Sequence, residues 1–451
     1  MDIKHYWRQL SPLKVLITGY IILSLLGALL LSFPFSCASG KSTLFLDALF
    51  TSSSAITTTG LIVVDTGSHF NIFGQTIIMI LFQIGGLGYM LYYVIALLVL
   101  GKKLSLRSSM LLRESLKRPI TFDIIQFTKR IILYTFIIEL LGAIFLSLYF
   151  LYYHQQLHPM KAVYSAVFHS ISAFNTAGFS IYADNLSAYH SSLIFNGIII
   201  GLFTLGAVGF YVLMDTRQFI IGKIKKERPN ELSLHSKFVF LLTLILGSIG
   251  TVLLFSTEYW RSSHSIKEKW LPSLFQTLSA LSTTGFNTIE IGRMADPGLT
   301  YLILAMFIGA GPGGTGGGIK ITTCGVLLAW LYSCLKGRKD VSAFQRRVPD
   351  EIIRWAFAVA LLASLWIFIA TMVLMISENL PFLPVLFETA SALGTVGLSM
   401  GITSGLSAAG KLIIITSMLI GRVGPLSVGL SLLADDKKIT YQYPDGEIYI
   451  G

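Results

Sequence analysis

The sequence predicts an all-α membrane protein: four tandem repeats in a pseudo-fourfold arrangement around one pore, with eight transmembrane helices plus four half-helices. Two observations predict this class. Only 13% of the 451 residues are charged and 53% are hydrophobic, whereas a soluble globular protein carries about 25% charged residues. In addition, one short motif recurs four times along the chain. The composition excludes a soluble multidomain protein and a disordered chain, because so few charges could not cover a soluble surface of this size.

Eight apolar stretches are each long enough to cross a bilayer, which requires about 20 residues. They cover approximately 13–33, 72–100, 131–153, 192–221, 236–257, 299–335, 353–376 and 407–433. The first has an apolar core of 21 residues. A signal-peptide core has only about 7–15 residues, so we interpret this stretch as a transmembrane helix. The sixth stretch contains a run rich in Gly and Pro and is expected to be broken.

The distribution of Lys and Arg predicts the orientation of these spans. The segments on one side of the membrane carry 24 of the 34 Lys and Arg residues, and the segments on the other side carry 7. The basic segments are the N-terminus, 101–130, 222–237, 336–354 and the tail. The positive-inside rule places them, and therefore both termini, in the cytoplasm. We expect a multi-pass protein of the cytoplasmic (cell inner) membrane. Its basic segments would face membrane lipid or an acidic cytosolic surface and not nucleic acid, because apolar spans separate them.

The motif F-x3-S-A-x2-T-x-G-[LF] occurs once in each of the four outer segments. Its glycines lie 107 to 118 residues apart, at Gly60, Gly178, Gly285 and Gly397. Two apolar spans separate consecutive copies, which predicts four repeats of span, half-helix and span. The predicted repeats are 1–100, 101–222 with a basic cytoplasmic linker, 223–335 with a broken second span, and 336–451 with a short C-terminal tail.

The residue types of the motif indicate how each copy would work. Each begins with a short apolar stretch, at about 43–54, 162–172, 270–279 and 383–391. Such a half-helix would point its partially negative C-terminal end at the bilayer interior. The T-x-G segment after it is expected to be extended, and an extended backbone survives at that depth only if it lines an aqueous path. A single copy would more simply be a turn, but four copies in register favour a cage of carbonyl oxygens around a monovalent cation.

The predicted filter therefore consists of four short strands, one from each repeat. They are Thr57, Thr58, Thr59 and Gly60; Asn175, Thr176, Ala177 and Gly178; Ser282, Thr283, Thr284 and Gly285; and Gly394, Thr395, Val396 and Gly397.

A gate is predicted on the cytoplasmic side of this filter. Each second span contains G-x-x-G about 24–28 residues after the filter glycine, which serves either helix packing or gating. In the third repeat, Pro and seven Gly within 309–318 exclude a continuous helix. We expect this run to form a movable plug beneath the filter, with a passive hinge as the alternative. The predicted gate residues are Gly311, Pro312, Gly313, Gly314, Thr315, Gly316, Gly317, Lys320 and Arg422.

Several charged residues lie within the spans. Arg422 is either a positive barrier beside the plug or the partner of Glu139 or Asp215 in a buried pair. Lys320 either pairs near the plug or extends its amine toward water, and the second is the preferred interpretation. For Glu139, a hydrogen bond that ties helices together is the preferred interpretation, and a proton-coupling site is the alternative. The half-helix acids Asp47 and Glu388 either attract cations or bind neighbouring backbone.

No catalytic constellation is predicted, so we expect neither an enzyme nor an organic cofactor. Residues 311–316 match G-x-G-x-x-G, but a dinucleotide site needs a preceding strand, and apolar helices flank this run. Residues 397–401 match G-x-S-x-G, but they belong to the predicted filter and not to a strand–turn–helix. The eight His and three Cys show no metal-ligand spacing.

With these residues the chain resembles the Trk/Ktr/HKT superfamily of potassium transporters, whose subunit has four tandem M1–pore helix–M2 repeats. The likeness covers nearly the whole chain and includes residues 83–88, 309–320 and 421–425. Because the first span starts near residue 13, without extra leading helices, the chain is similar to the Ktr-type membrane subunit.

The resemblance implies K⁺ as the transported ion, because in this family a serine at the first filter glycine accompanies Na⁺ transport. It also implies a homodimer with one pore per subunit, regulated by a cytosolic ring of nucleotide-binding proteins. The plug and Arg422 match the family's gate elements. The filter position before each Thr varies among the repeats, which leaves Na⁺ as a second transported ion. A Na⁺- or H⁺-coupled secondary cation transporter stays open as the alternative, with Glu139 as its coupling group.

Overall fold

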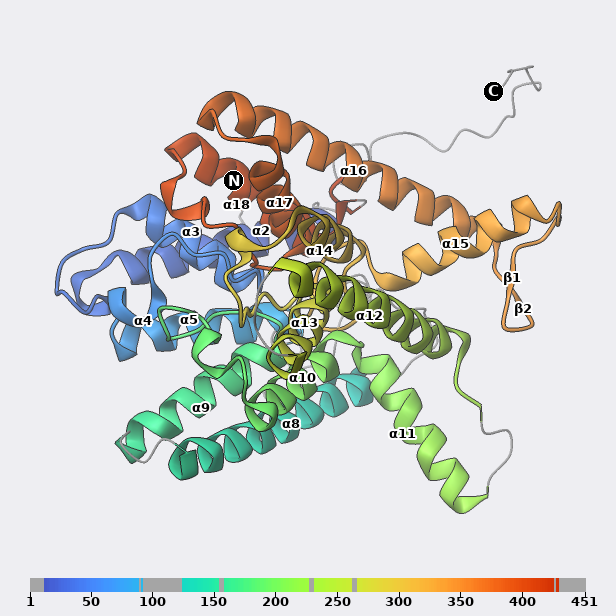
Figure 1. Ribbon diagram of the computed structural model, residues 1–451, viewed down its shortest axis with the longest axis horizontal. Coiled ribbons are helices and arrows are strands. Elements are labelled where there is room, and N and C mark those ends of the chain that lie inside the picture. The colour runs from blue at the N-terminus through green and yellow to red at the C-terminus, as the bar shows by residue number, and fades with distance from the viewer. Residues whose placement is uncertain are drawn as a thin grey trace, which may run out of the picture.

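The computed structural model describes residues 12–88, 91, 124–153, 158–226, 231–261, 266–425 and 427–429. Four long helices in it are apolar enough to cross a membrane (Figure 1). They are α2 (Pro12–Ser32), α8 (Ile124–Tyr153), α12 (Leu234–Arg261) and α16 (Asp350–Glu378). Only 28–33% of the most apolar window of each is buried inside the protein. Their other apolar side chains are therefore available to lipid. These four helices correspond to the first span of each predicted repeat.

Four shorter helices follow these spans, as the motif predicts. They are α3 (Phe45–Ile56), α9 (Pro159–Phe174), α13 (Ile266–Leu281) and α17 (Phe382–Gly394). Each packs on the long helix before it: α3 on α2, α9 on α8, α13 on α12 and α17 on α16. The fully buried Phe50, Phe168, Phe275 and Phe387 anchor them. The first residue of the motif is therefore a core side chain in all four copies.

The second span of each repeat is not a single long helix. These helices are α5 (Ile72–Leu87), α10 (Leu193–Ala207) with α11 (Phe210–Lys225), α14 (Asp296–Ile308) with α15 (Ile321–Leu335), and α18 (Ala408–Val423). The apolar stretch over 192–221 is not one straight helix, because α10 and α11 meet at 100°. Gly209 lies at the bend with φ 97°, a conformation that only glycine adopts readily. The second half of the 72–100 stretch lies largely outside the described residues.

The remaining elements are short and lie between the spans. They are α4 (Thr66–His69), the 3₁₀ turns η1 (Pro34–Ser36), η2 (Ser187–Tyr189), η3 (Ile291–Arg293) and η4 (Thr403–Gly405), and strands β1 (Ser342–Ala343) and β2 (Arg346–Arg347). The two strands form an antiparallel hairpin that pairs Ser342 with Arg347. This hairpin and α11 extend from the body of the molecule in Figure 1.

The repeats close into a ring. In Figure 1 the chain runs around the centre from α2 and α3 through α8 to α10, then α12 to α14, and finally α16 to α18. The second span of each repeat packs against the half-helix of the next: α5 against α9, α10 against α13, and α14 against α17. The last contact, α18 against α3, joins the fourth repeat to the first. The pseudo-fourfold arrangement predicted from the motif is therefore confirmed.

Candidate functional site

The half-helices end in the same turn in every repeat. The motif threonines Thr58, Thr176, Thr283 and Thr395 have φ between 49° and 56°. In the first copy, Thr58 N–H donates to the Ala55 carbonyl at 3.0 Å and Thr59 N–H donates to the Ser54 carbonyl at 2.8 Å. The equivalent bonds of the other copies are 3.0–3.1 Å and 2.8–2.9 Å. This pair of bonds is the Schellman motif that terminates a helix through a left-handed residue.

The turn corrects one expectation. The T-x-G segment was predicted to be extended, but both its threonine and its glycine have positive φ in all four copies. A β-branched residue with positive φ is an outlier that persists only where its surroundings hold it. The recurring S-A-x2-T spacing could have revealed the turn, because its Ser and Ala supply the two carbonyls.

The four T-x-G segments meet one another in a closed ring. Their glycines have φ between 66° and 94°. A Cβ on any of them would overlap a carbonyl oxygen of the next repeat: Ala177 for Gly60, Thr284 for Gly178, Val396 for Gly285 and Thr59 for Gly397. The structure therefore brings all four predicted filter strands together, with backbone so close that only glycine fits. All their side chains are buried, Ser282 being the most exposed at 7%.

Hydroxyl groups hold the chain that leaves this ring. Ser172 Oγ donates to the Phe179 carbonyl at 2.8 Å, and Ser279 Oγ donates to the Phe286 carbonyl at 2.7 Å. In the fourth repeat Ser391 Oγ instead accepts from a backbone N–H, at 3.0 Å. In the second and third repeats the serine of the motif thus fixes the residue after the glycine to its own half-helix, and in the fourth repeat it holds Gly397 itself.

An outer cavity of about 750 Å³ opens on one side of the ring. Segments that follow the filter glycines in all four repeats line it, and three of those glycines form its floor. Its lining includes Asp65, Asp184 and Glu290, and none of the described lining residues is Lys or Arg. A cavity with this charge attracts cations.

The glycine-rich loop between α14 and α15 lies against the other side of the ring. Thr315 N–H donates to the Gly206 carbonyl at 3.1 Å, and Thr315 Oγ1 donates to the Phe174 carbonyl at 3.0 Å. Thr176 Oγ1 also lies 3.2 Å from Thr315 Oγ1. The predicted plug is thus bound to the second repeat at the end of its half-helix.

The same loop contacts the third and fourth repeats. Gly317 N–H donates to Thr283 Oγ1 at 3.2 Å. A Cβ on Gly317 would overlap the side chain of Thr395. The loop therefore contacts motif threonines of the second and third repeats and lies against that of the fourth.

Arg422 joins this loop to the first repeat. Its guanidinium donates to Thr58 Oγ1 at 2.9 Å and to the Gly86 carbonyl at 3.0 Å. It also donates to the carbonyls of Gly85 and Thr315. Of the two predicted alternatives, the structure supports the position beside the plug. Among the described residues no pair with either predicted acid is seen.

Lys320 does not extend toward water as expected. Its Nζ donates to the Gly316 carbonyl at 2.5 Å and to the Gly317 carbonyl at 2.9 Å. The residue has φ 93° and ψ 133°, close to the values of Gly209 and Gly424 at the breaks of the second and fourth repeats. Lys320 therefore takes the place of that glycine, a backbone position that no sequence pattern indicated, and its amine binds the loop, in agreement with the less favoured of the two interpretations.

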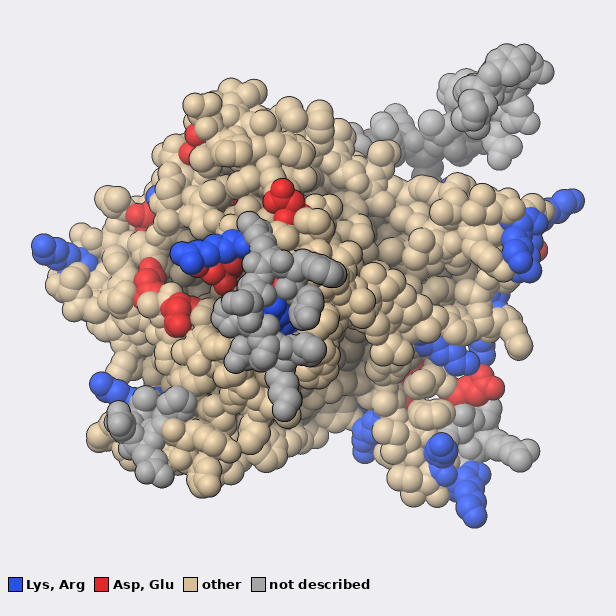
Figure 2. Space-filling model, viewed as in Figure 1, with Lys and Arg blue, Asp and Glu red and all other residues tan. Residues whose placement is uncertain are grey.

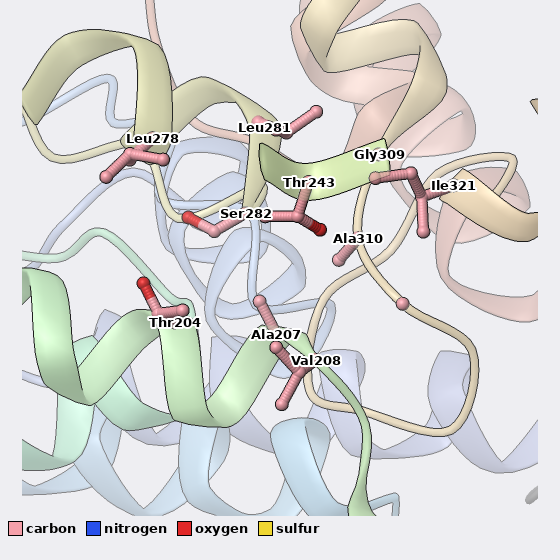
Figure 3. Close-up of a pocket in the computed structure, with 11 residues that line it drawn as sticks. Thr204, Ala207, Val208, Thr243, Leu278, Leu281, Ser282, Gly309, Ala310 and Ile321 are labelled. Carbon is pink, nitrogen blue, oxygen red and sulfur yellow. The ribbon is translucent and has the colours of Figure 1, made fainter. Parts of the chain in front are cut away.

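A small pocket lies beside the loop, between the second and third repeats (Figure 3). Figure 3 shows Ala207 and Val208 at the end of α10 facing Ala310 of the loop, with Ser282 above them. The start of the loop forms part of its wall. The start of the loop is nevertheless held to the end of α10, because Gly311 N–H donates to the Ala207 carbonyl at 2.9 Å.

Glu139 forms hydrogen bonds between helices, in agreement with the preferred interpretation. Its carboxylate accepts from Gln83 Nε2 at 3.2 Å and from Asn175 Nδ2 at 2.9 Å. Asn175 Nδ2 also donates to Gln83 Oε1 at 2.6 Å. The carboxylate thus joins α5, α8 and the predicted filter residue of the second repeat.

The two half-helix acids have different partners. Asp47 forms an ion pair with Lys411 of α18 at 2.6 Å, with each side chain 15% exposed. Glu388 is fully buried and accepts from Ser399 Oγ at 2.9 Å and from Thr403 Oγ1. Neither acid is available to attract cations in the way that one interpretation required.

These features define a class of helical membrane proteins. In this class four repeats surround one axis, their backbone segments approach closely around that axis, and a loop lies against one side of the resulting ring. The sequence profile of a transporter family described as "TrkH: Cation transport protein" matches residues 11–438. The chain belongs to this family, which consists of transporters and not enzymes.

Relatives and a solved structure agree with this membership. The chain is 40% identical to "Ktr system potassium uptake protein B" of Bacillus subtilis, over 99% of this chain and 98% of the relative. It is 33% identical to "Potassium/sodium uptake protein NtpJ" of Enterococcus hirae, over 99% of both chains. The fold matches the potassium transporter TrkH from Vibrio parahaemolyticus with a TM-score of 0.73 and 20% identity, covering 94% of this chain and 85% of that one.

Proposed function

We propose that this protein takes up K⁺ across the cytoplasmic membrane through the ring of T-x-G segments. The observation that carries the proposal is the closed cycle in which each filter glycine faces a carbonyl oxygen of the next repeat. Backbone held this closely presents carbonyl oxygens to a narrow axis, where they replace the hydration shell of a monovalent cation. The potassium relatives support K⁺ as that ion.

The acidic outer cavity would concentrate cations at the entrance. An inside-negative membrane potential then drives entry by about 2.3 kcal/mol per charge per 100 mV. The filter would select K⁺ through the residues predicted for it, and all four filter glycines are present. Uptake of this kind needs no coupled ion, and Na⁺ enters only as a competing cation.

The glycine-rich loop would act as the gate. Its hydrogen bonds to Thr176, Thr283 and Arg422 support a closed state in which the loop is held against the ring. Because these bonds join the loop to three other segments of the ring, opening requires them to break together.

The partners form a further part of this proposal. We expect a homodimer with one pore per subunit, docked on a cytosolic ring of nucleotide-binding proteins. Figure 2 shows Lys and Arg gathered near the β1–β2 hairpin and near the end of α11 that points away from the body of the molecule. Residues 336–354 and 222–237, which contain these groups, were assigned to the cytoplasmic side together with both termini. A basic surface of this kind fits an acidic partner or anionic lipid headgroups.

Uptake of ⁸⁶Rb⁺ into proteoliposomes with an inside-negative potential tests the ion assignment. We expect K⁺ to compete with Rb⁺ and Na⁺ and Li⁺ to compete weakly. Uptake that needs a Na⁺ or proton gradient, even when a potential is present, would contradict the proposal.

Gly60→Ser tests the filter itself. The new Cβ would overlap the Ala177 carbonyl oxygen and would add strain at φ 86°. The displaced carbonyl should lower the preference for K⁺ over Na⁺ by about tenfold, which corresponds to about 1.4 kcal/mol. The matched control is Gly40→Ser, because Gly40 also has positive φ, at 67°, but has no atom within 4 Å of the Cβ position. If Na⁺ competes with Rb⁺ equally well in both variants, the first repeat does not contribute to ion selection.

A further inference from the structure

The four filter strands share one backbone conformation, but two kinds of side-chain hydrogen bond divide them into two opposite pairs. In the first repeat, Thr57 Oγ1 and Thr59 Oγ1 are hydrogen bonded at 2.8 Å. In the third repeat, Ser282 Oγ and Thr284 Oγ1 are bonded at 2.7 Å. These hydroxyls flank the left-handed threonine and lock the turn. The second and fourth repeats have Ala177 and Val396 at the second position, so they cannot form this bond.

The second and fourth repeats have a different bond instead. His169 Nε2 lies 3.0 Å from Ser180 Oγ, and Ser399 Oγ donates to Glu388 Oε2 at 2.9 Å. His169 and Glu388 both directly follow the motif phenylalanine, and both serines stand two residues after the filter glycine. The two bonds are therefore equivalent, and they lie in repeats on opposite sides of the ring.

No such bond is seen in the described parts of the other two repeats. Their residues at the serine position are Ile62 and Asn287. Thr51 Oγ1 donates to the Asp47 carbonyl of its own half-helix. The first and third repeats thus use the hydroxyl pair, and the second and fourth use the bond from half-helix to exit strand.

The environment of His169 fixes the direction of its bond. The ring is fully buried, and its Nδ1 lies 2.8 Å from the Ser165 carbonyl, so Nδ1 carries a hydrogen. The neutral ring then accepts at Nε2 from the Ser180 hydroxyl. Tyr182 stacks on the ring with centroids 4.8 Å apart and an interplanar angle of 15°. His169 is thereby a rigid anchor at the rim of the outer cavity.

Glu388 is anchored in a comparable way. It is fully buried in α17, and a second hydroxyl, from Thr403, also donates to its carboxylate. Ser180, Ser399 and Thr403 all line the outer cavity. His169 and Glu388 therefore each bind a serine that lines the outer cavity and lies two residues after a filter glycine.

We propose that His169 and Glu388 are positioning residues that fix the outer end of the filter in the second and fourth repeats, and so help to determine which monovalent cation is preferred. This inference rests on the proposed filter function. The spacing of carbonyls around an ion depends on how firmly each strand is held. These two bonds hold the strands of the second and fourth repeats, which lack the hydroxyl pair. Their loss should therefore let the carbonyls of these two opposite strands move relative to the ion.

Removing the serine partners tests the proposal with little risk to folding, because each change deletes one oxygen at the cavity surface. In proteoliposomes, Ser180→Ala and Ser399→Ala should each lower the preference for Rb⁺ over Na⁺ about fivefold, the factor that corresponds to about 1 kcal/mol for one hydrogen bond. The matched control is Thr51→Val, at the position equivalent to His169 in the first repeat, and it should leave the preference unchanged.

A double-variant cycle separates positioning from general destabilisation. His169→Phe keeps the stacked ring but loses the nitrogen. Ser180 Oγ also bonds the Tyr182 N–H and the Asn185 carbonyl, so Ser180→Ala removes more than the bond to His169. The double variant should therefore change the ion preference no more than Ser180→Ala alone, because Ser180→Ala already removes the bond that His169→Phe removes. Additive effects, or single variants that transport with the wild-type preference, would overturn the inference and leave the proposed function standing. Wild-type protein without Rb⁺ uptake would instead overturn the proposed function.

Discussion

All four motif threonines form the turn that ends a half-helix, and three of them also contact the glycine-rich loop or Arg422. Glycine would fit the left-handed position with less strain, yet all four repeats have threonine there. The hydroxyl groups explain the choice in three of them, because Thr58 binds Arg422, Thr176 binds Thr315 and Thr283 binds the backbone of the loop. A shift of the turn would therefore change the contact with the closed loop, and the reverse also holds.

Arg422 should stabilise the closed state. Replacing it by Met removes its hydrogen bonds to Thr58, to the loop and to the end of α5. Hydrogen bonds from a charged donor contribute about 1.5–3 kcal/mol, so basal ⁸⁶Rb⁺ uptake by Arg422→Met should rise about tenfold or more. Uptake at the wild-type level would show that the closed loop does not depend on this side chain.

Arg422→Lys distinguishes charge from geometry. A lysine keeps the positive charge but cannot reach several acceptors with a planar group. If hydrogen bonding holds the loop, Lys should raise basal uptake nearly as much as Met. If the positive charge alone limits flux, the Lys variant should behave like the wild type.

Glu139→Gln should leave transport independent of the proton gradient. The carboxylate accepts from two amide groups and ties helices together, which is a structural position. The amide can keep one of these bonds, so we expect a stability loss of about 1 kcal/mol and K⁺ uptake close to wild type. The measurement is uptake at fixed membrane potential with and without a pH gradient. Abolished uptake, with the protein still folded, would support the coupled-transporter alternative.

At the scale of elements, the second spans show why the sequence predicted only part of the fold. The half-helices were predicted within a few residues, because an apolar run followed by T-x-G marks their ends. The break between α10 and α11 was not predicted, because hydrophobicity continues across 192–221 and a single G-x-x-G is compatible with an unbroken helix. The positive φ of Gly209, which causes the bend, leaves no trace in composition.

The glycine-rich loop should control basal flux through its length. It must reach from the end of α14 to Thr315 and back to Lys320, and its backbone bonds to Gly206 and Thr283 fix its path. Deleting three residues within 311–317 should prevent these bonds and raise basal ⁸⁶Rb⁺ uptake. Deletion of Ser39 and Gly40, in an exposed outer loop, serves as the control. A shortened loop with unchanged uptake would favour a passive hinge.

For the whole molecule, the motif predicted the repeats but not how they fit together. Four copies in register imply one axis. However, the contacts that build the site join residues about 100 positions apart in different repeats, such as Gly60 with Ala177. Asn175 similarly depends on Gln83 and Glu139 from two other helices. Such partners follow from the order in which the repeats pack, and no local pattern encodes that order.

The ion pair between Asp47 and Lys411 should stabilise the closure of the ring, because it joins the half-helix of the first repeat to the last helix of the fourth. Lys411→Met or Asp47→Asn leaves one charge unpaired in a largely buried position, which should cost about 1–3 kcal/mol. Thermal unfolding of the purified protein measures this loss. The double variant should be less destabilised than the sum of the single variants, and additive losses would show that the pair does not couple the two repeats.

The contact of α18 with α3 also has a consequence for the assembly of the protein during translation. A ribosome delivers the helices to the membrane in chain order, so the first half-helix waits without its final neighbour until translation is nearly finished. A nascent polypeptide of three repeats has no complete ring and hence no defined passage for ions. If the proposed function holds, a nascent chain that stops before α18 should therefore not conduct ions, because the contact that joins the fourth repeat to the first is still missing.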